Sequence, residues 1–103
     1  MKRVIAIDPG STHSGVCVID AETYRPLYMA KLDNNDVAEK VDGYLAELEV
    51  ATVIEMIGHY GTGMPAGKDV FDTCVWIGRF IEQFVADSEV VETLPRATVK
   101  MHL

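Results

Sequence analysis

The stretch Arg3-Val-Ile-Ala-Ile-Asp8-Pro-Gly10-Ser-Thr-His-Ser-Gly15 decides the fold of this protein. Its first half is almost continuously apolar, which is typical of a central strand that is buried on both faces. A proline and a glycine then stop the strand and start a tight turn. The strand therefore brings one carboxylate, that of Asp8, to its C-terminal end, where ligand sites of such sheets are commonly found.

Two further extended segments and a helix follow this stretch. Residues Gly15–Asp20 are rich in valine and isoleucine, and a short polar turn separates them from a third extended run at about Arg25–Lys31. Three consecutive strands of this kind predict an antiparallel meander. Capping side chains at Asp33–Asp36, followed by apolar residues at helical spacing as far as Leu48, then predict an amphipathic helix of about three turns.

The second half of the chain continues the alternation of strands and helices. Thr52–Met56 predicts a short buried strand parallel to the first one, and a longer helix is expected from Asp69, or a residue just before it, to about Ala86. Between them, the glycine-rich segment Gly58–Lys68 predicts a loop. Glu89–Leu94 predicts a fifth strand. The order β-β-β-α-β-α-β predicts an α/β fold with a mixed five-stranded sheet flanked by helices.

Composition and charge narrow the class of protein. With 103 residues, of which 49% are apolar, the chain is long enough for one domain, spanning residues 1–103, and too short for two. Its net charge of −7 argues against a broad positive surface for nucleic acid, although metal ions bound by clustered acids would reverse the local field.

Cys17 and Cys74 stand in apolar surroundings without metal-ligand spacing, so we expect buried, reduced thiols. The sequence shows no signal-like or membrane-spanning stretch, which predicts a cytoplasmic protein.

Two carboxylates carry the strongest functional signal. Glu55 lies within the apolar run Val53–Ile57, where a charge is costly to bury unless it is paired or binds a cation. If the strands that carry Asp8 and Glu55 are adjacent, the two carboxylates lie about 5 Å apart laterally and can share a metal ion. Oxygen ligands of this kind suit Mg²⁺, with Mn²⁺ as a substitute. Two alternatives remain open: Asp8 only caps the turn, and Glu55 is an exposed strand end.

Several residues around these carboxylates are candidates for contacts with DNA. Three hydroxyl side chains follow the first strand and can hydrogen-bond phosphate, namely Ser11, Thr12 and Ser14. The glycine-rich segment offers two rings and a cation that can stack on or pair with DNA, namely His59, Tyr60 and Lys68. A solvated surface loop explains the same three residues equally well. Asp72 is either a third metal ligand or a first-turn acid favoured by the helix dipole.

Taken together, these motifs resemble those of RuvC-type Holliday junction resolvases, which have an RNase H-like fold. The pattern Asp8-Pro-Gly-Ser-x-x-Ser-Gly-x-x-Val-Ile is similar to the first motif of that family, and Val53-Ile-Glu-Met-Ile is similar to the second. Phe71–Phe84, with its Gly78-Arg79, is similar to the helix that follows, and Pro95–Lys100 resembles the strand before the third motif. The resemblance runs over essentially the whole chain, and the order and spacing of the motifs carry more weight than either motif alone.

The resemblance implies a function as well as a fold. Asp8 and Glu55 would be catalytic metal ligands, and the reaction would be paired, Mg²⁺-dependent nicking of branched DNA by a homodimer in DNA recombination. The remaining ligands of the family are acids on a C-terminal helix. No acid lies between Arg96 and Leu103. The chain is therefore expected to lack that helix, to carry part of the active site, and to be inactive by itself.

Two other functions are compatible with the same residues. One is a non-catalytic nucleic-acid-binding module that keeps the RNase H-like sheet but lacks the last metal ligands. The acidic composition favours this module. The other is a nucleotide-binding domain related to actin and the sugar kinases, in which a strand ending in aspartate also precedes a loop of Gly, Ser and Thr. Those proteins need two such domains, and 103 residues cannot supply both.

Overall fold

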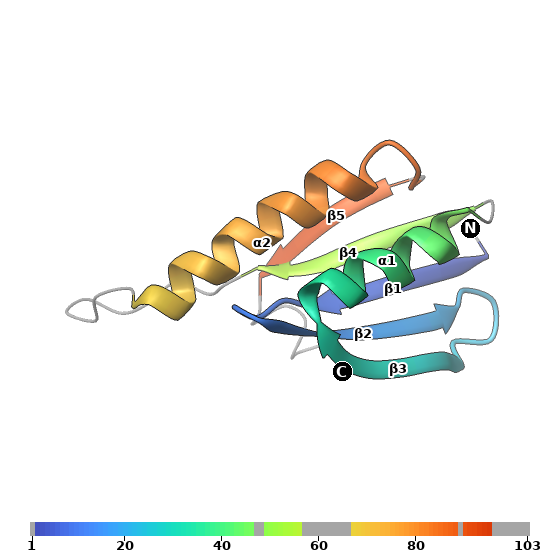
Figure 1. Ribbon diagram of the computed structural model, residues 1–103. Coiled ribbons are helices and arrows are strands. Elements are labelled where there is room, and N and C mark those ends of the chain that lie inside the picture. Colours follow the sequence, from blue (N-terminus) through green and yellow to red (C-terminus); the bar gives the residue numbers. More distant parts are fainter. Residues whose placement is uncertain (1, 47–48, 57–66, 89, 96–103) are drawn as a thin grey trace.

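The computed structural model describes residues 2–46, 49–56, 67–88 and 90–95, which form one mixed sheet and two helices in the predicted order β-β-β-α-β-α-β (Figure 1). Within these ranges, no helix is long and apolar enough to cross a membrane. The elements are β1 (Arg3–Asp8), β2 (His13–Asp20), β3 (Pro26–Asp33), α1 (Asn34–Leu45), β4 (Val50–Met56), α2 (Lys68–Phe84) and β5 (Val90–Pro95).

The sheet has five strands in the order β3-β2-β1-β4-β5, so the first strand of the chain is the central one. β1, β2 and β3 form the predicted antiparallel meander. β4 is parallel to β1, as predicted, and β5 is parallel to β4. Parallel neighbours need a crossover connection, and α2 carries the chain from β4 to β5. The C-terminal ends of β1, β4 and β5 therefore meet at one edge of the sheet.

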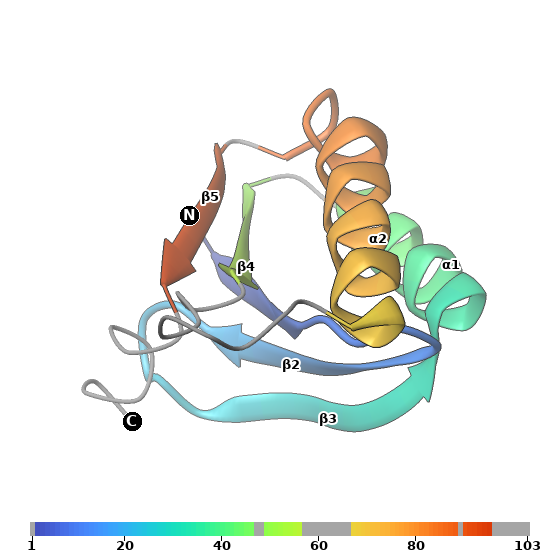
Figure 2. The ribbon, with the colours of Figure 1, turned by 90° about the vertical axis from the view of Figure 1, so that its left-hand side faces the viewer.

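Both helices pack on the same side of the sheet, which we call the helix-covered face (Figure 2). Alternate strand residues point into this layer because strand side chains alternate between the two faces. Two phenylalanine rings of α2 stack within it, with the centroids of Phe80 and Phe84 5.7 Å apart. The strand residues of the helix-covered face, all at most 3% exposed, are Ile5, Ile7, Val16, Val18, Val50, Thr52 and Ile54.

The opposite side of the sheet, which we call the open face, is covered by no helix of the described residues (Figure 2). Its surface is a shallow apolar hollow with two carboxylates at one edge. Cys17 is half-buried there, and burial raises the pKa of its thiol. The residues of the open face that line this hollow are Val4, Ala6, Asp8, Gly15, Cys17, Ile19, Met29, Val53, Glu55 and Leu94.

Some element boundaries differ from the sequence-based predictions by a few residues. β2 begins at His13 and β3 ends at Asp33, because the ladder pairs these two polar residues where the sequence pattern predicted a turn. β4 begins at Val50, before the β-branched run on which its prediction rested. α1 ends at Leu45, and the predicted helical position Leu48 lies outside the described residues.

The start of α2 corrects the prediction for the glycine-rich segment. Lys68, predicted to end a loop, is the first residue of the helix, and the N-cap is Gly67, which has no side chain with which to cap. The cap therefore precedes Asp69, which the prediction also allowed, and Asp69 itself lies inside the first turn, where the helix dipole favours an acid. The helix ends at Phe84, slightly before the predicted Ala86.

α2 is buried along one side only, although its many apolar residues predict extensive burial. Phe71 is 62% exposed and Val75 is 52% exposed. Cys74 is exposed as well, so the prediction of a buried thiol is wrong for this residue. The cause is the helical period: a helix that lies on one sheet buries a single stripe of side chains. The buried stripe of α2 consists of Thr73, Ile77, Phe80 and Phe84.

Candidate metal centre at the edge of the open face

Asp8 and Glu55 lie on neighbouring central strands at the same edge of the sheet. The parallel register of β1 and β4 pairs Ala6 with Val53 and Ile7 with Ile54. Continuing this register by one residue brings Asp8 beside Glu55, with the strands about 5 Å apart. β1 and β4 are therefore adjacent, as the predicted site required, and the side chains of Asp8 and Glu55 both line the hollow of the open face.

The surroundings of the two carboxylates leave them accessible to a ligand. Asp8 is exposed, and Glu55 is half-buried rather than a fully exposed strand end. On the other side of β1, Asp8 pairs with Gly15 of β2. A Cβ atom built on Gly15 would lie 3.6 Å from the Cβ atom of Asp8. The glycine therefore leaves space beside Asp8 that any other residue would fill.

The donor set fits a hard divalent cation. Mg²⁺ is commonly bound through one or two carboxylates and retains several waters, and Asp8 and Glu55 supply such a pair of oxygen donors. In the described part of the chain, no group of three or more His, Cys, Asp or Glu side chains gathers to hold a metal. The described residues therefore fit one ion with two protein ligands, and they are too few for the bridged pair of ions used in two-metal hydrolysis.

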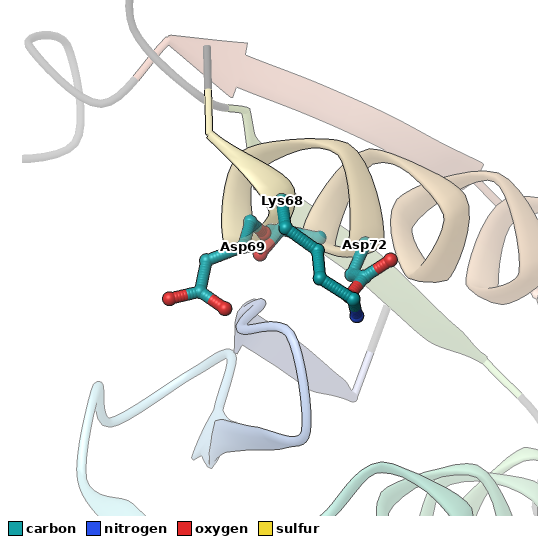
Figure 3. A network of polar contacts seen from close by, with 4 residues as sticks. Lys68, Asp69 and Asp72 are labelled. Atoms are coloured by element: carbon teal, nitrogen blue, oxygen red, sulfur yellow. Dashed lines mark hydrogen bonds and ion pairs between the residues drawn. The ribbon is translucent and has the colours of Figure 1, made fainter.

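Asp72 is engaged within α2. The Lys68 ammonium donates to Asp72 Oδ2 at 2.5 Å across one helical turn, while Asp69 points away from this pair (Figure 3). The hydrogen bond to Asp72, and then its charge, raise the pKa of Lys68. Thr73 Oγ1 donates to the backbone oxygen of Asp69 at 2.7 Å. This ion pair argues against Asp72 as a third metal ligand. The acid in the first turn of the helix is Asp69, so Asp72 lies one turn further along than the alternative interpretation placed it.

The hydroxyl side chains after β1 fall into two groups. Ser14 is 1% exposed, and its hydroxyl donates to Asn34 Oδ1 at 2.5 Å and accepts from the Gly10 N–H at 3.1 Å. The expectation that Ser14 contacts phosphate is therefore corrected, because this hydroxyl lies in the interior and is already engaged as donor and acceptor. Thr12 is exposed and Ser11 is half-buried, so these two lie at the surface of the turn beyond Asp8.

The three candidates from the glycine-rich segment are described only in part. Lys68 is exposed and stands in the first turn of α2, paired with Asp72. His59 and Tyr60 lie outside the described residues. Of this set, Lys68 alone therefore has a defined position, on a helix rather than in a loop.

One residue at this edge was not anticipated from the sequence. Asn34, the first residue of α1, is 1% exposed, and its Nδ2 donates to the Gly10 carbonyl at 3.0 Å. Its backbone N–H donates to the carbonyl of Thr12 at 2.9 Å. The sequence pattern assigned this region to helix capping, yet the cap is Asp33, whose carboxylate accepts from the Asn35 N–H. The available signal was a run of capping side chains longer than one cap requires.

Comparison with known proteins supports the fold through structure and not through sequence. No protein-family model matches the chain, and no curated protein matches it by sequence. The chain is similar to RuvC of Thermus thermophilus in complex with a Holliday junction substrate, with a TM-score of 0.74 and 17% identity over 100% of this chain and 70% of that one. A second structure of Thermus thermophilus RuvC gives a TM-score of 0.62 and 20% identity over 96% of this chain and 67% of that one.

A further match is weaker and carries no argument. It is a glucokinase from an Antarctic psychrotroph, with a TM-score of 0.43 and 14% identity over 92% of this chain and 32% of that one. At the identities found, the likeness to RuvC establishes the fold alone. The predicted RNase H-like fold, a mixed five-stranded sheet with helices, is thereby confirmed.

Proposed function

We propose that this chain forms part of a divalent-metal-dependent endonuclease that acts on branched DNA, with Asp8 and Glu55 as its catalytic metal ligands. One observation carries the proposal: the parallel register of β1 and β4 brings two carboxylates together at the C-terminal edge of the open face. The RNase H-like fold supports it, because the RuvC of the matched complex was found with a Holliday junction substrate.

The chemistry of the proposed site follows from its donor atoms. Asp8 and Glu55 would hold Mg²⁺, or Mn²⁺ in its place, through carboxylate oxygens. A bound ion supplies polarisation of the phosphodiester and a water nucleophile at neutral pH. Its charge also offsets, locally, the acidic balance of a protein with a net charge of −7. A second ion needs further acidic ligands, so we assign to this chain part of an active site.

The experiment that tests the proposal compares a four-way junction with a linear duplex of the same sequence. Binding is measured by fluorescence anisotropy in Ca²⁺, which supports binding without promoting cleavage. We expect tighter binding of the junction, and loss of the Ca²⁺-dependent part in Asp8→Asn and in Glu55→Gln. Glu39→Gln, which removes an exposed acid of α1, is the matched control and should bind as the unaltered protein does. Equal binding of both DNAs would contradict the proposal.

DNA contacts are assigned to side chains around the edge of the open face. The proposed set is Ser11, Thr12 and Lys68, with His59 and Tyr60 as further candidates. Lys68→Ala should weaken junction binding and lower the slope of log affinity against log salt by about one, since one phosphate contact is lost. Asp72→Asn should strengthen binding, because it removes the carboxylate that holds the Lys68 ammonium. If neither variant changes the affinity, Lys68 is no DNA contact.

A homodimer in the cytoplasm completes the proposal, since the resemblance implies paired nicking of junction DNA. Sedimentation equilibrium should then give twice the mass of the chain, and a monomer mass at every concentration would remove the dimer from the proposal.

Two alternatives to the endonuclease make different predictions. A non-catalytic nucleic-acid-binding module should bind junctions equally well after Asp8→Asn. A nucleotide-binding domain should show thermal protection by ATP and no affinity for DNA.

A further inference from the structure

We infer that Asn34 is a positioning residue of the metal centre: it holds the turn at residues 9–12 and thereby keeps the Asp8 carboxylate beside Glu55. The inference rests on the proposed function, because it gives Asn34 a role toward the proposed metal ligand. Asn34 belongs to α1, which is far from β1 in sequence. It reaches the turn through a side chain that is 1% exposed.

The contacts of Asn34 form a closed ring with the turn. Asn34 Nδ2 donates to the Gly10 carbonyl at 3.0 Å, and Asn34 Oδ1 accepts from the Ser14 hydroxyl at 2.5 Å. The same hydroxyl accepts from the Gly10 N–H at 3.1 Å. Both backbone polar groups of Gly10 are thus fixed by buried side chains. The backbone N–H of Asn34 adds a fourth hydrogen bond, to the carbonyl of Thr12.

The polarity of this ring determines the orientation of the amide. A carbonyl can only accept, so the atom of Asn34 that faces the Gly10 oxygen must be the NH₂ group. The remaining oxygen of the amide then accepts from Ser14, which leaves the serine lone pairs for the Gly10 N–H. Each donor meets an acceptor, and a side chain without both functions, such as alanine, breaks the ring at two points. Fully satisfied buried networks of this kind select one geometry.

The anchored residue is close enough in the chain to control Asp8. Gly10 is two residues beyond Asp8, and the residue between them is Pro9, whose ring fixes φ and removes one backbone freedom. A Cβ atom on Gly10 would lie 2.2 Å from the carbonyl oxygen of His13, which shows how closely the turn folds back on itself. Anchoring Gly10 therefore restricts the direction in which the chain leaves Asp8, at the end of β1, just beyond the last pair of its ladder with β4.

Helix capping does not explain the burial of this amide. The first turn of α1 is capped by Asp33, whose carboxylate accepts from the Asn35 N–H at 2.9 Å. An apolar residue at position 34 would fill the same interior space without the desolvation of an amide. An asparagine at this position instead fixes the geometry of the turn. This turn directly follows Asp8.

The test measures Mn²⁺ affinity and the stability of the turn in the same variants. Asn34→Ala removes both side-chain contacts, and Ser14→Ala removes one member of the ring with a smaller change in volume. The matched control is Thr52→Val, because Thr52 is also fully buried and hydrogen-bonded, to Ser88 Oγ at 2.8 Å, but faces the helix-covered side. Mn²⁺ titration is followed by electron paramagnetic resonance at a temperature where circular dichroism shows every variant folded.

We expect Asn34→Ala to weaken Mn²⁺ binding about 10- to 100-fold, as is typical when a residue that orients a ligand is removed. Ser14→Ala should weaken it in the same direction, so the test stands even if Asn34→Ala fails to fold. Hydrogen exchange of the Gly10 amide should become faster in both variants without metal. Thr52→Val should lower stability and leave both the Mn²⁺ affinity and the Gly10 exchange rate unchanged.

The outcomes separate this inference from the proposed function. If the unaltered protein binds Mn²⁺ and the Asn34 and Ser14 variants bind it equally well, the positioning role is wrong and the metal centre stands. If Thr52→Val weakens binding as much as Asn34→Ala does, the effect follows stability and the positioning role is again wrong. If the unaltered protein binds no Mn²⁺, the proposed function fails, and the role of Asn34 toward a metal fails with it.

Discussion

The two faces of the sheet are made from the same strands and differ in almost every physical respect. On the helix-covered face, side chains such as Ile54 and Val18 are fully buried under α1 and α2. On the open face, Met29 is 70% exposed and two carboxylates stand at the edge. One strand thus supplies alternate residues to a core and to a candidate site. If the proposed site is correct, stability and function are carried by opposite faces of β1 and β4.

The alternation also explains how a charged pair is tolerated in central strands. Asp8 and Glu55 follow Ile7 and Ile54, which point to the opposite side. Shifting the register of either strand by one residue would place its carboxylate in the core and its isoleucine on the open face. The hydrophobic pattern therefore fixes the position of the site as firmly as it fixes the core.

The largest expected effect comes from truncating one side chain on each face. Ile54→Ala should lower the free energy of unfolding by about 2–5 kcal/mol, because it leaves a cavity beneath the helices. Met29→Ala should change it by about 0.5 kcal/mol or less, since the methionine is 70% exposed. Urea denaturation of both variants measures the contrast. Equal losses would mean that the open face is also a packed interior in the folded protein.

A second contrast concerns the backbone at the edge of the open face. Gly10→Ala should destabilise the protein by about 1–3 kcal/mol, because its Cβ atom would lie 2.2 Å from the His13 carbonyl oxygen. Gly78→Ala, in α2, meets no described atom within 4 Å and should stabilise the helix by about 0.5–1 kcal/mol. Thermal unfolding of the two variants gives opposite shifts if the turn is as tight as the contacts of Gly10 indicate. Two shifts of the same sign would disprove this.

The smallest effect concerns Asp20, an acid that lies outside the candidate site and is held by backbone N–H groups. Asp20 accepts from the backbone N–H groups of Thr23 and Glu22, which lower its pKa. Its contribution to stability is therefore complete above the ordinary carboxyl pKa and is lost as the pH falls through the lowered value of the folded state.

Urea denaturation between neutral and acid pH checks this contribution. Asp20→Asn should be less stable than the unaltered protein at neutral pH, and the difference should shrink as the pH falls. Mn²⁺ should bind to this variant as it does to the unaltered protein. A stability difference that stays constant with pH would show that the charge of the Asp20 carboxylate does not stabilise the turn at residues 20–23.

Much of the fold could be predicted because its signals are local. Arg3–Asp8 was predicted with its observed bounds, since the apolar run is closed by proline and glycine. The meander and the parallel fourth strand follow from short connections and from the β-α-β order. The burial of α2 was overestimated, because its many apolar residues suggested extensive burial against the sheet. A helix that lies on one sheet buries one stripe, and Phe71 belongs to the exposed side.

The candidate site could be predicted only in its carboxylates. Asp8 and Glu55 were identified by their place at the ends of apolar strands, and strand adjacency brought them together. Ser14 was predicted to contact phosphate, but it belongs to β2, which begins two residues earlier than the apolar pattern indicates. Because strand side chains alternate, Ser14 points inward on the same face as Val16. Asn34 was missed because a buried amide and a capping amide look the same in a sequence.

Calorimetric titration with Mn²⁺ tests the central claim most directly, namely that the edge of the open face is a divalent-metal site built by two parallel strands. The account predicts one Mn²⁺ per chain in the unaltered protein and in Glu39→Gln, and no measurable binding in Asp8→Asn or in Glu55→Gln. Unchanged Mn²⁺ affinity in either carboxylate variant would contradict it.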